Sequence, residues 1–247
     1  MSQTPLPPTP DDRRIQITGL GNLRDVGGYP AQGGRTTRWR RLLRSDAPHV
    51  TDAGGRAVLV GYGLRTVLDL RTDVEAELAP VALDGIEARR LRISLLGGDL
   101  HQVPRQLAAI YRYLIDERGA AIGAAVSTLA GAGRIPALVH CSAGKDRTGI
   151  VIGLILAVLG VPDEVIAVDY ALSAHHVNPA ATNAIAQLQA SSGLGGAFAP
   201  ELLTSPPHLF LDVLTWVRDL SGTVDAYLLA RGVTPAELDT LREELTQ

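Results

Sequence analysis

The stretch IPALVHCSAGKDRTGIVIGLILAVLGV, residues 135–161, indicates the architecture of the chain. Its first part, 135–140, is typical of a buried strand, and the apolar run 149–161 predicts a buried helix. The intervening residues are mostly polar, so a short loop must connect the end of the strand to the start of the helix. A strand, a tight turn and a helix N-terminus predict an α/β unit whose loop can bind an anion.

The pattern on either side of this unit predicts an α/β fold. Further strands are expected at 40–45, 65–71 and 88–94, and helices at 51–61, 105–117 and 120–133. Strands that alternate with helices favour a central, mostly parallel sheet flanked by helices. After residue 161 the pattern is helical, and Thr234 and Glu237 match a capping box, with Pro235 at the first helical position, that predicts the last helix. We expect this helical C-terminal half to pack on the sheet.

Composition and charge narrow the functional classes. The chain has 247 residues, of which 46% are hydrophobic and 20% charged, as in a globular protein. Residues 1–14 are rich in proline and polar groups, so we expect a flexible tail there and a single domain over 15–247. The formal charge of −3 gives no general attraction to nucleic acid, so we expect no nucleic-acid partner and only a local anion site.

The sequence also bears on membranes and on the compartment. The apolar run 149–161 is well short of the ~18 residues that a membrane-spanning helix needs. The polar start of the chain is unlike a signal peptide. One cysteine allows no internal disulfide, which suits a reducing compartment. We therefore expect no membrane span and a cytoplasmic location.

The loop contains the only cysteine and the only lysine of the chain, Cys141 and Lys145. The first N–H groups of a helix are unpaired and the helix dipole is positive there, so a phosphate group fits this position. The same positive environment favours a cysteine thiolate, which is a nucleophile aimed at the bound phosphoryl group. Arg147 can fold back and hold two phosphoryl oxygens with its planar guanidinium, and Lys145 is expected at the rim as a second cation.

Several other interpretations of this loop are weaker. A lone cysteine is usually a small core residue, but the strand, the glycine, the arginine and the apolar helix around Cys141 favour chemistry. A Walker loop would need glycine five residues before Gly144, where Val139 stands. An arsenate reductase needs further thiols, and a rhodanese loop usually has four residues between cysteine and arginine, whereas this loop has five. A phosphate-binding module without catalytic activity is an alternative from another class.

Residues 140–149 read His-Cys-x-x-Gly-Lys-Asp-Arg-Thr-Gly and resemble the Cys-x5-Arg signature of protein tyrosine phosphatases. The chain is similar to the bacterial tyrosine phosphatases of the phosphatase B type from about residue 15 to its end. The other stretches that carry this resemblance, in the same order, are 22–29, 41–48, 67–77, 169–173 and 227–245. Unlike members with a long helical lid after the third strand, this chain has only LLGGDLHQVP, 95–104, before the next helix.

The resemblance implies a phosphatase fold, a phosphocysteine intermediate, no metal or other cofactor, and hydrolysis of phosphotyrosine in proteins to release inorganic phosphate. Some members of the family also accept phosphoserine, phosphothreonine or phosphoinositides, and the lysine-bearing loop is thought to favour the last of these. A phosphoinositide phosphatase that uses the same loop therefore stays the alternative function.

Each loop residue then has an expected role. Cys141 attacks phosphorus, Arg147 and the loop N–H groups stabilise the transition state, and water hydrolyses the phosphocysteine. His140 and Thr148 are expected to support the loop and the sulfur. The phosphate-binding segment comprises Ser142, Ala143, Gly144, Lys145, Asp146 and Arg147.

A tyrosyl leaving group needs a proton, and two aspartates compete for the role of general acid. Asp99 follows two glycines beyond the third strand and matches an aspartate at the same place in the family, so we place it first. Asp146 lies inside the loop, but beside Arg147 it could serve only to orient that guanidinium. We expect Arg24, Asp25 and Asp69 in buried ion pairs. Arg44 and Arg71 end strands and could line the cleft.

Overall fold

A computed structural model describes residues 13–49, 51–98, 100–176 and 204–247. Its sheet has five strands in the order β1-β2-β5-β3-β4. The strands are β1 (Arg24–Asp25), β2 (Leu42–Ser45), β3 (Thr66–Asp69), β4 (Arg89–Arg92) and β5 (Ala137–His140). β1 pairs antiparallel with β2, and the other three pairings are parallel. The predicted mostly parallel sheet is confirmed; the four expected strands are present but shorter, and β1 was not expected.

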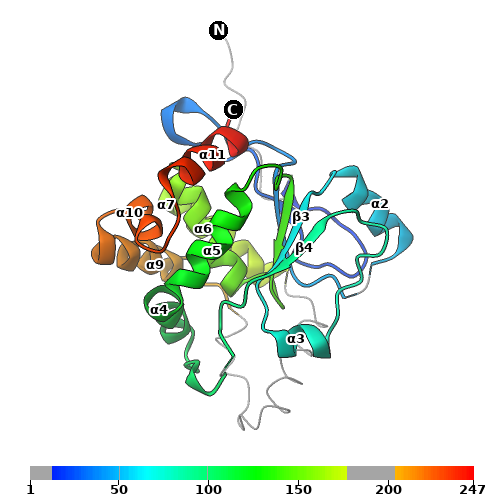
Figure 1. Ribbon diagram of the computed structural model, residues 1–247, viewed down its shortest axis with the longest axis horizontal. Coiled ribbons are helices and arrows are strands. Elements are labelled where there is room, and N and C mark those ends of the chain that lie inside the picture. Colours follow the sequence, from blue (N-terminus) through cyan, green and yellow to red (C-terminus); the bar gives the residue numbers. More distant parts are fainter. Residues whose placement is uncertain (1–12, 50, 99, 177–203) are drawn as a thin grey trace.

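Helices cover both faces of this sheet (Figure 1). α2 (Ala53–Gly61) and α3 (Asp73–Leu78) lie on one side; α4 (Leu107–Glu117), α5 (Gly119–Ala130), α6 (Asp146–Val158), α7 (Asp163–Ala171), α9 (Pro207–Ser221), α10 (Val224–Leu229) and α11 (Pro235–Leu245) lie on the other. Short 3-10 helices are η1 (Gln32–Gly34), η2 (Leu100–Gln102) and η3 (Leu172–His175). The C-terminal helices pack on the sheet as expected, and the Thr234/Glu237 capping box is present.

Alternation along β5 separates two apolar cores, because successive side chains of a strand point to opposite faces. Ala137 and Val139 face the larger core with α4–α6 and the C-terminal helices. Leu138 faces the smaller core beneath α2. α6 (Asp146–Val158) is buried along almost its whole length, as the apolar run predicted.

Buried charges join the N-terminal segment to α7. Asp169 accepts hydrogen bonds from Arg24 Nε (2.9 Å) and Tyr29 Oη (3.0 Å) and forms an ion pair with Arg44 Nη1 (2.5 Å). The buried ion pair expected for Arg24 is therefore confirmed. Arg44 is 1% exposed and lies under the loop rather than in a cleft. Asp25 forms no ion pair with a described residue; it accepts hydrogen bonds from the N–H groups of Gly27 and Arg40.

The described part of the chain starts with Arg13, whose side chain is buried and lies against the Tyr29 ring at 3.9 Å. The backbones of Arg14 and Arg24 form an isolated antiparallel β-bridge. Both residues, which we expected in the tail, thus contact the folded body. The described helices include none that is both long and apolar enough to cross a membrane.

Candidate active site

The loop between β5 and α6 lies where the parallel strands β2, β5 and β3 end, the edge at which α/β proteins bind ligands. β5 ends at His140 and α6 begins at Asp146, so the loop comprises 141–145. Cys141 is a free cysteine and is 2% exposed. The strand and the helix on either side fix the ends of the loop, and the start of α6 presents unpaired N–H groups beside the sulfur.

The carbonyl groups of the loop are bound from outside. The donors are Ala47 N to Ser142 O (3.1 Å), Asn22 Nδ2 to Ala143 O (2.9 Å) and Arg44 Nη2 to Gly144 O (2.9 Å). The N–H groups of these three loop residues donate to no residue in the described ranges. A loop with its carbonyls bound outward and its N–H groups unused forms a concave site for an anion.

Gly144 allows the loop to approach β2. Its φ of +67° favours glycine, and a Cβ built there would lie 2.3 Å from Ser45 O. Any side chain at this position would force the loop and the strand apart. The glycine seen in the sequence signature is therefore required by both the backbone conformation and the packing.

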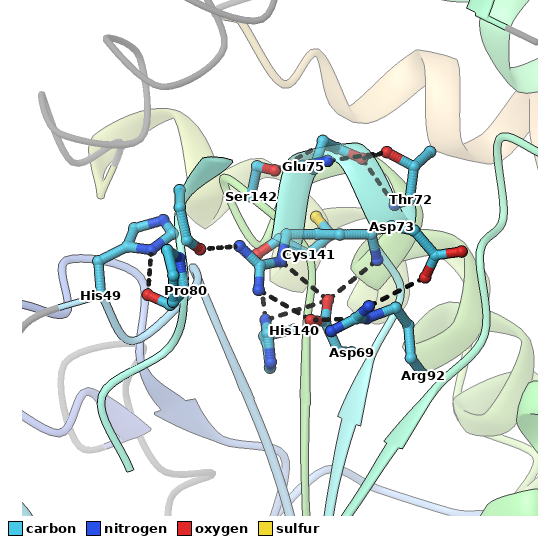
Figure 2. A network of polar contacts seen from close by, with 12 residues as sticks. His49, Asp69, Thr72, Asp73, Glu75, Pro80, Arg92, His140, Cys141 and Ser142 are labelled. Atoms are coloured by element: carbon cyan, nitrogen blue, oxygen red, sulfur yellow. Dashed lines mark hydrogen bonds and ion pairs between the residues drawn. The ribbon is translucent and has the colours of Figure 1, made fainter. Parts of the chain in front are cut away.

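Arg147 is held by a carboxylate from α3 that the sequence analysis did not identify. Glu75 Oε2 accepts from Arg147 Nη1 (2.6 Å) and Glu75 Oε1 from Nη2 (2.7 Å); Oε1 also accepts from Ser142 Oγ (2.7 Å). Figure 2 shows Glu75 with Ser142 on one side and Thr72 on the other. Glu75 binds the two terminal nitrogens of Arg147, and Nη2 also lies 3.5 Å from Ser142 Oγ, so Nε and the second N–H of Nη1 are left for phosphoryl oxygens.

The electrostatics of this pair favour its charged form. Burial alone would raise the pKa of Glu75, but the charge and hydrogen bonds of Arg147 outweigh burial and lower that pKa to about 2. The Glu75 charge likewise raises the pKa of Arg147 above its ordinary value, although burial acts in the opposite direction. Arg147 therefore presents a fixed positive charge at the loop.

Asp146 forms no hydrogen bond or ion pair with Arg147 among the contacts of the described residues. Its Oδ1 accepts a hydrogen bond from Tyr111 of α4, whose hydroxyl also lies 2.7 Å from that of Tyr170. The carboxylate that binds the Arg147 guanidinium is that of Glu75. Lys145 was placed wrongly: it is 2% exposed instead of lying at the rim. Its Nζ donates to Thr204 O (2.6 Å) and forms an ion pair with Asp146 (3.2 Å), because the start of α6 turns it inward.

His140 and Thr148 are fully buried on either side of the loop. His140 Nδ1 lies 3.3 Å from Cys141 O and 3.8 Å from Asp69 Oδ1, so the proton of the neutral ring belongs on Nδ1. Burial lowers the pKa of His140 to about 4, although Asp69 acts in the opposite direction. The Thr148 hydroxyl makes no hydrogen bond within the described ranges.

The structure places the other expected residues as follows. Asp99 lies outside the described residues. Asp69 and Arg71 form a buried pair through two hydrogen bonds, Nε to Oδ1 (2.9 Å) and Nη2 to Oδ2 (2.8 Å). The ion pair expected for Asp69 is confirmed, and Arg71 is 1% exposed.

Three functional residues were missed: Asn22, Glu75 and Tyr111. The sequence around Glu75 does indicate a local role, because Thr72-x-x-Glu75 matches the capping box that starts α3. Nothing local in the sequence indicates that the same carboxylate reaches Arg147. Tyr111 stands in an ordinary amphipathic helix, and only the packing of α4 brings its hydroxyl to the loop.

Comparisons with known proteins identify the family. Residues 15–247 match the tyrosine phosphatase family. The triple specificity protein phosphatase PtpB of Mycobacterium tuberculosis is 30% identical over 92% of this chain and 97% of its own length. A tyrosine-protein phosphatase of Nostoc commune is 30% identical over 82% of this chain and 73% of its own. A solved structure of P. aeruginosa TpbA covers 80% of this chain and 89% of that one, with 20% identity and a TM-score of 0.35. The chain therefore belongs to the tyrosine phosphatase family.

Proposed function

We propose that the protein hydrolyses phosphotyrosine esters in proteins, with Cys141 as the nucleophile. The observation that carries the proposal is the arrangement of loop 141–147: its carbonyls are bound outward, its N–H groups are unused, and Arg147 is fixed by Glu75. These groups surround one position at the start of α6, where a phosphoryl group with three equatorial oxygens fits.

Two displacements give a balanced reaction. The Cys141 thiolate attacks phosphorus, the S–P bond forms, the P–O bond to tyrosine breaks, and a general acid protonates the leaving oxygen. Water then attacks the phosphocysteine, its proton passes to the conjugate base of that acid, and inorganic phosphate and the thiolate are released. Arg147 and the loop N–H groups bind the equatorial oxygens in both steps. Thr148 can donate its unused hydroxyl to the sulfur as the thiolate departs.

Asp146 now has stronger support as the general acid. Tyr111 binds Oδ1 of Asp146, which leaves Oδ2 to carry the proton toward the leaving group. Orientation of Arg147, the competing role, belongs to Glu75. Asp99 remains the other candidate. Reaction of Asp146→Asn and Asp99→Asn variants with aryl phosphates of graded leaving-group pKa distinguishes the two: loss of the acid slows poor leaving groups most.

Phosphotyrosine in proteins is the substrate that we place first. The feature that favoured the phosphoinositide alternative is Lys145, and this residue is buried, with its Nζ donating to Thr204 O. The name of the Mycobacterium relative indicates that members of the family can have more than one specificity. The single thiol suits the reducing cytoplasm, where we place the enzyme.

The test compares wild type with Cys141→Ser on a phosphotyrosine peptide, a phosphoserine peptide and phosphoinositide vesicles, all with EDTA. We expect phosphate release to be fastest from phosphotyrosine and absent in Cys141→Ser, which should still bind the ester. Turnover by Cys141→Ser would exclude the mechanism. A preference of about tenfold or more in kcat/KM for the lipid, about 1.4 kcal/mol, would keep the mechanism and change the substrate.

A further inference from the structure

A cavity of about 260 Å³ lies on the α3 side of the sheet, behind the catalytic loop. β3, β4 and β5 line it, together with α3 and the segment 80–83. None of the residues 141–147 lines it, so it is separate from the phosphate site. His140, the last residue of β5, lines the cavity and directly precedes Cys141 in the sequence.

The register of the sheet concentrates charge on the cavity wall. Asp69 pairs with His140 of β5 on one side and with Arg92 of β4 on the other, so the three side chains form a row across the sheet. Arg90 is paired with Val67 in the next row of the same face. Figure 2 shows Asp69 between His140 and Arg92.

Positive charge exceeds negative charge in this wall. Arg71, Arg90 and Arg92 line the cavity with a single carboxylate, Asp69, which Arg71 already binds through two hydrogen bonds. Arg90 has no carboxylate partner among the described residues; its Nη2 donates to Leu83 O at 2.8 Å. Arg92 forms a longer ion pair with the same carboxylate, Asp69 (Nε to Oδ2, 3.6 Å), and a second with Asp73, whose side chain is 80% exposed; such surface pairs contribute about 1 kcal/mol or less.

One of the residues that line the cavity, His140, has a ring nitrogen without a partner among the described residues. His140 Nε2 is buried and makes no hydrogen bond to a described residue, while Nδ1 faces Cys141 O and Asp69. In Figure 2 the second ring nitrogen of His140 points away from Asp69. Because the proton of the neutral ring is on Nδ1, Nε2 is an acceptor, and the partner that it lacks is a donor such as a hydroxyl group of the occupant; the arginines of the wall, not this nitrogen, would bind the negative charge.

The size and the apolar part of the wall define the occupant. A dry cavity of about 150 Å³ accommodates benzene, so this one accommodates a substituted ring but is smaller than the ~300–1,000 Å³ of drug-sized pockets. Val67, Val81 and Leu83 supply apolar surface. We propose that this cavity is a second binding site, for a small organic anion with a compact apolar body such as an aromatic carboxylate.

Two connections link the cavity to the catalytic loop. His140 contacts the carbonyl of Cys141, and Ala76, which lines the cavity on α3, follows directly after Glu75, the partner of Arg147. An anion in the cavity therefore acts on both supports of the phosphate site. By linkage, phosphate in the loop and the anion in the cavity change each other's affinity by the same factor.

Calorimetric titration with benzoate tests the site, and benzamide serves as the neutral probe of the same shape. The titrations are made with and without inorganic phosphate at saturation, so that the catalytic loop is blocked in one arm. We expect one benzoate per chain in both arms and benzamide binding weaker by about tenfold or more. In a series of phosphate concentrations, a benzoate Kd that rises in proportion to phosphate without levelling off would place the anion in the catalytic loop and overturn the proposal, whereas coupling between two sites levels off.

Neighbouring arginines of β4 provide matched variants. Arg90→Gln and Arg92→Gln alter the cavity wall, whereas Arg89→Gln makes the same change on the opposite face of the strand. We expect the first two to weaken benzoate binding about tenfold and Arg89→Gln to leave it unchanged. Equal losses in all three, or none, would overturn the proposal. Phosphatase activity without benzoate is measured in parallel, so failure of the cavity site is distinguishable from failure of the proposed enzyme function.

Discussion

Replacing Glu75 by glutamine removes the carboxylate that holds Arg147. Both side chains are buried, with 6% and 8% of their residue surface exposed. The pKa of Glu75 falls from 4.5 to about 2, and at about 1.4 kcal/mol per unit this corresponds to roughly 3 kcal/mol of stability. The same order, about 3–5 kcal/mol, is typical when one partner of a buried ion pair is removed. For a chain of this size we expect Glu75→Gln to lower Tm by roughly 6–12 °C.

Thermal unfolding and steady-state kinetics on an aryl phosphate measure the two consequences together. Glu77→Gln is the control, because it makes the same chemical change on the exposed face of the same helix. We expect Glu75→Gln to reduce kcat by about a hundredfold, since Arg147 loses the contact that aims it at the transition state. Glu77→Gln should leave both Tm and kcat near the wild-type values.

A double-mutant cycle isolates the pair. Arg147→Gln alone leaves the Glu75 charge buried without a partner, and the double change Glu75→Gln/Arg147→Gln removes both charges. We expect the double variant to be less destabilised than the sum of the single variants by about 1–3 kcal/mol. A Glu75→Gln protein that unfolds within about 2 °C of wild type and shows additive double-mutant energies would refute this reasoning.

Three further predictions address other parts of the site. Burial lowers the pKa of His140 from 6.5 to about 4, so as the pH falls the unfolded chain takes up this proton before the folded chain does. The contribution of His140 to the free energy of unfolding is therefore complete above pH 6.5 and is lost between pH 6.5 and 4. Urea unfolding at a series of pH values should show this slope in the wild type and a flatter one in His140→Gln. Gly144→Ala should reduce activity about a hundredfold and should destabilise the protein more than the control Gly133→Ala. Gly133 has a similar φ of +65°, but a Cβ added there meets nothing within 4 Å. Equal free energies of unfolding for the two variants would contradict the predicted clash. If the Tyr111 hydroxyl orients Asp146, Tyr111→Phe should shift the pH profile of kcat and slow the hydrolysis of esters with poor leaving groups more than of esters with good ones. An equal loss of rate for all leaving groups would indicate a purely structural role for Tyr111.

The loop and its place in the fold could be predicted because both depend on local sequence. The apolar strand β5, the glycine Gly144 and the apolar helix α6 specify the turn that brings Cys141 and Arg147 together. The four longer strands and most helices followed from periodicity, and their ends differ by a few residues because tertiary contacts set them. β1, with two residues, is too short to leave a periodic signal.

The partners of the loop could not be predicted, since they come from distant parts of the chain. Glu75 reaches Arg147 across 72 positions, and Asn22 reaches Ala143 across 121. Lys145 was expected to be exposed because lysine usually is; the packing around the start of α6 buries its amine instead. Such contacts depend on how β2, β3 and β5 align, which a single sequence shows only in part.

The most direct test of the central claim is an acid quench during turnover of a phosphotyrosine peptide, followed by peptide mass spectrometry. If Cys141 is the nucleophile, one phosphoryl group appears on the peptide that contains Cys141, and it disappears when substrate is exhausted. Asp146→Asn should increase the trapped fraction if the same group activates the water that hydrolyses the intermediate. Continued phosphate release with no phosphoryl group on Cys141, or with one on another residue, would contradict the claim.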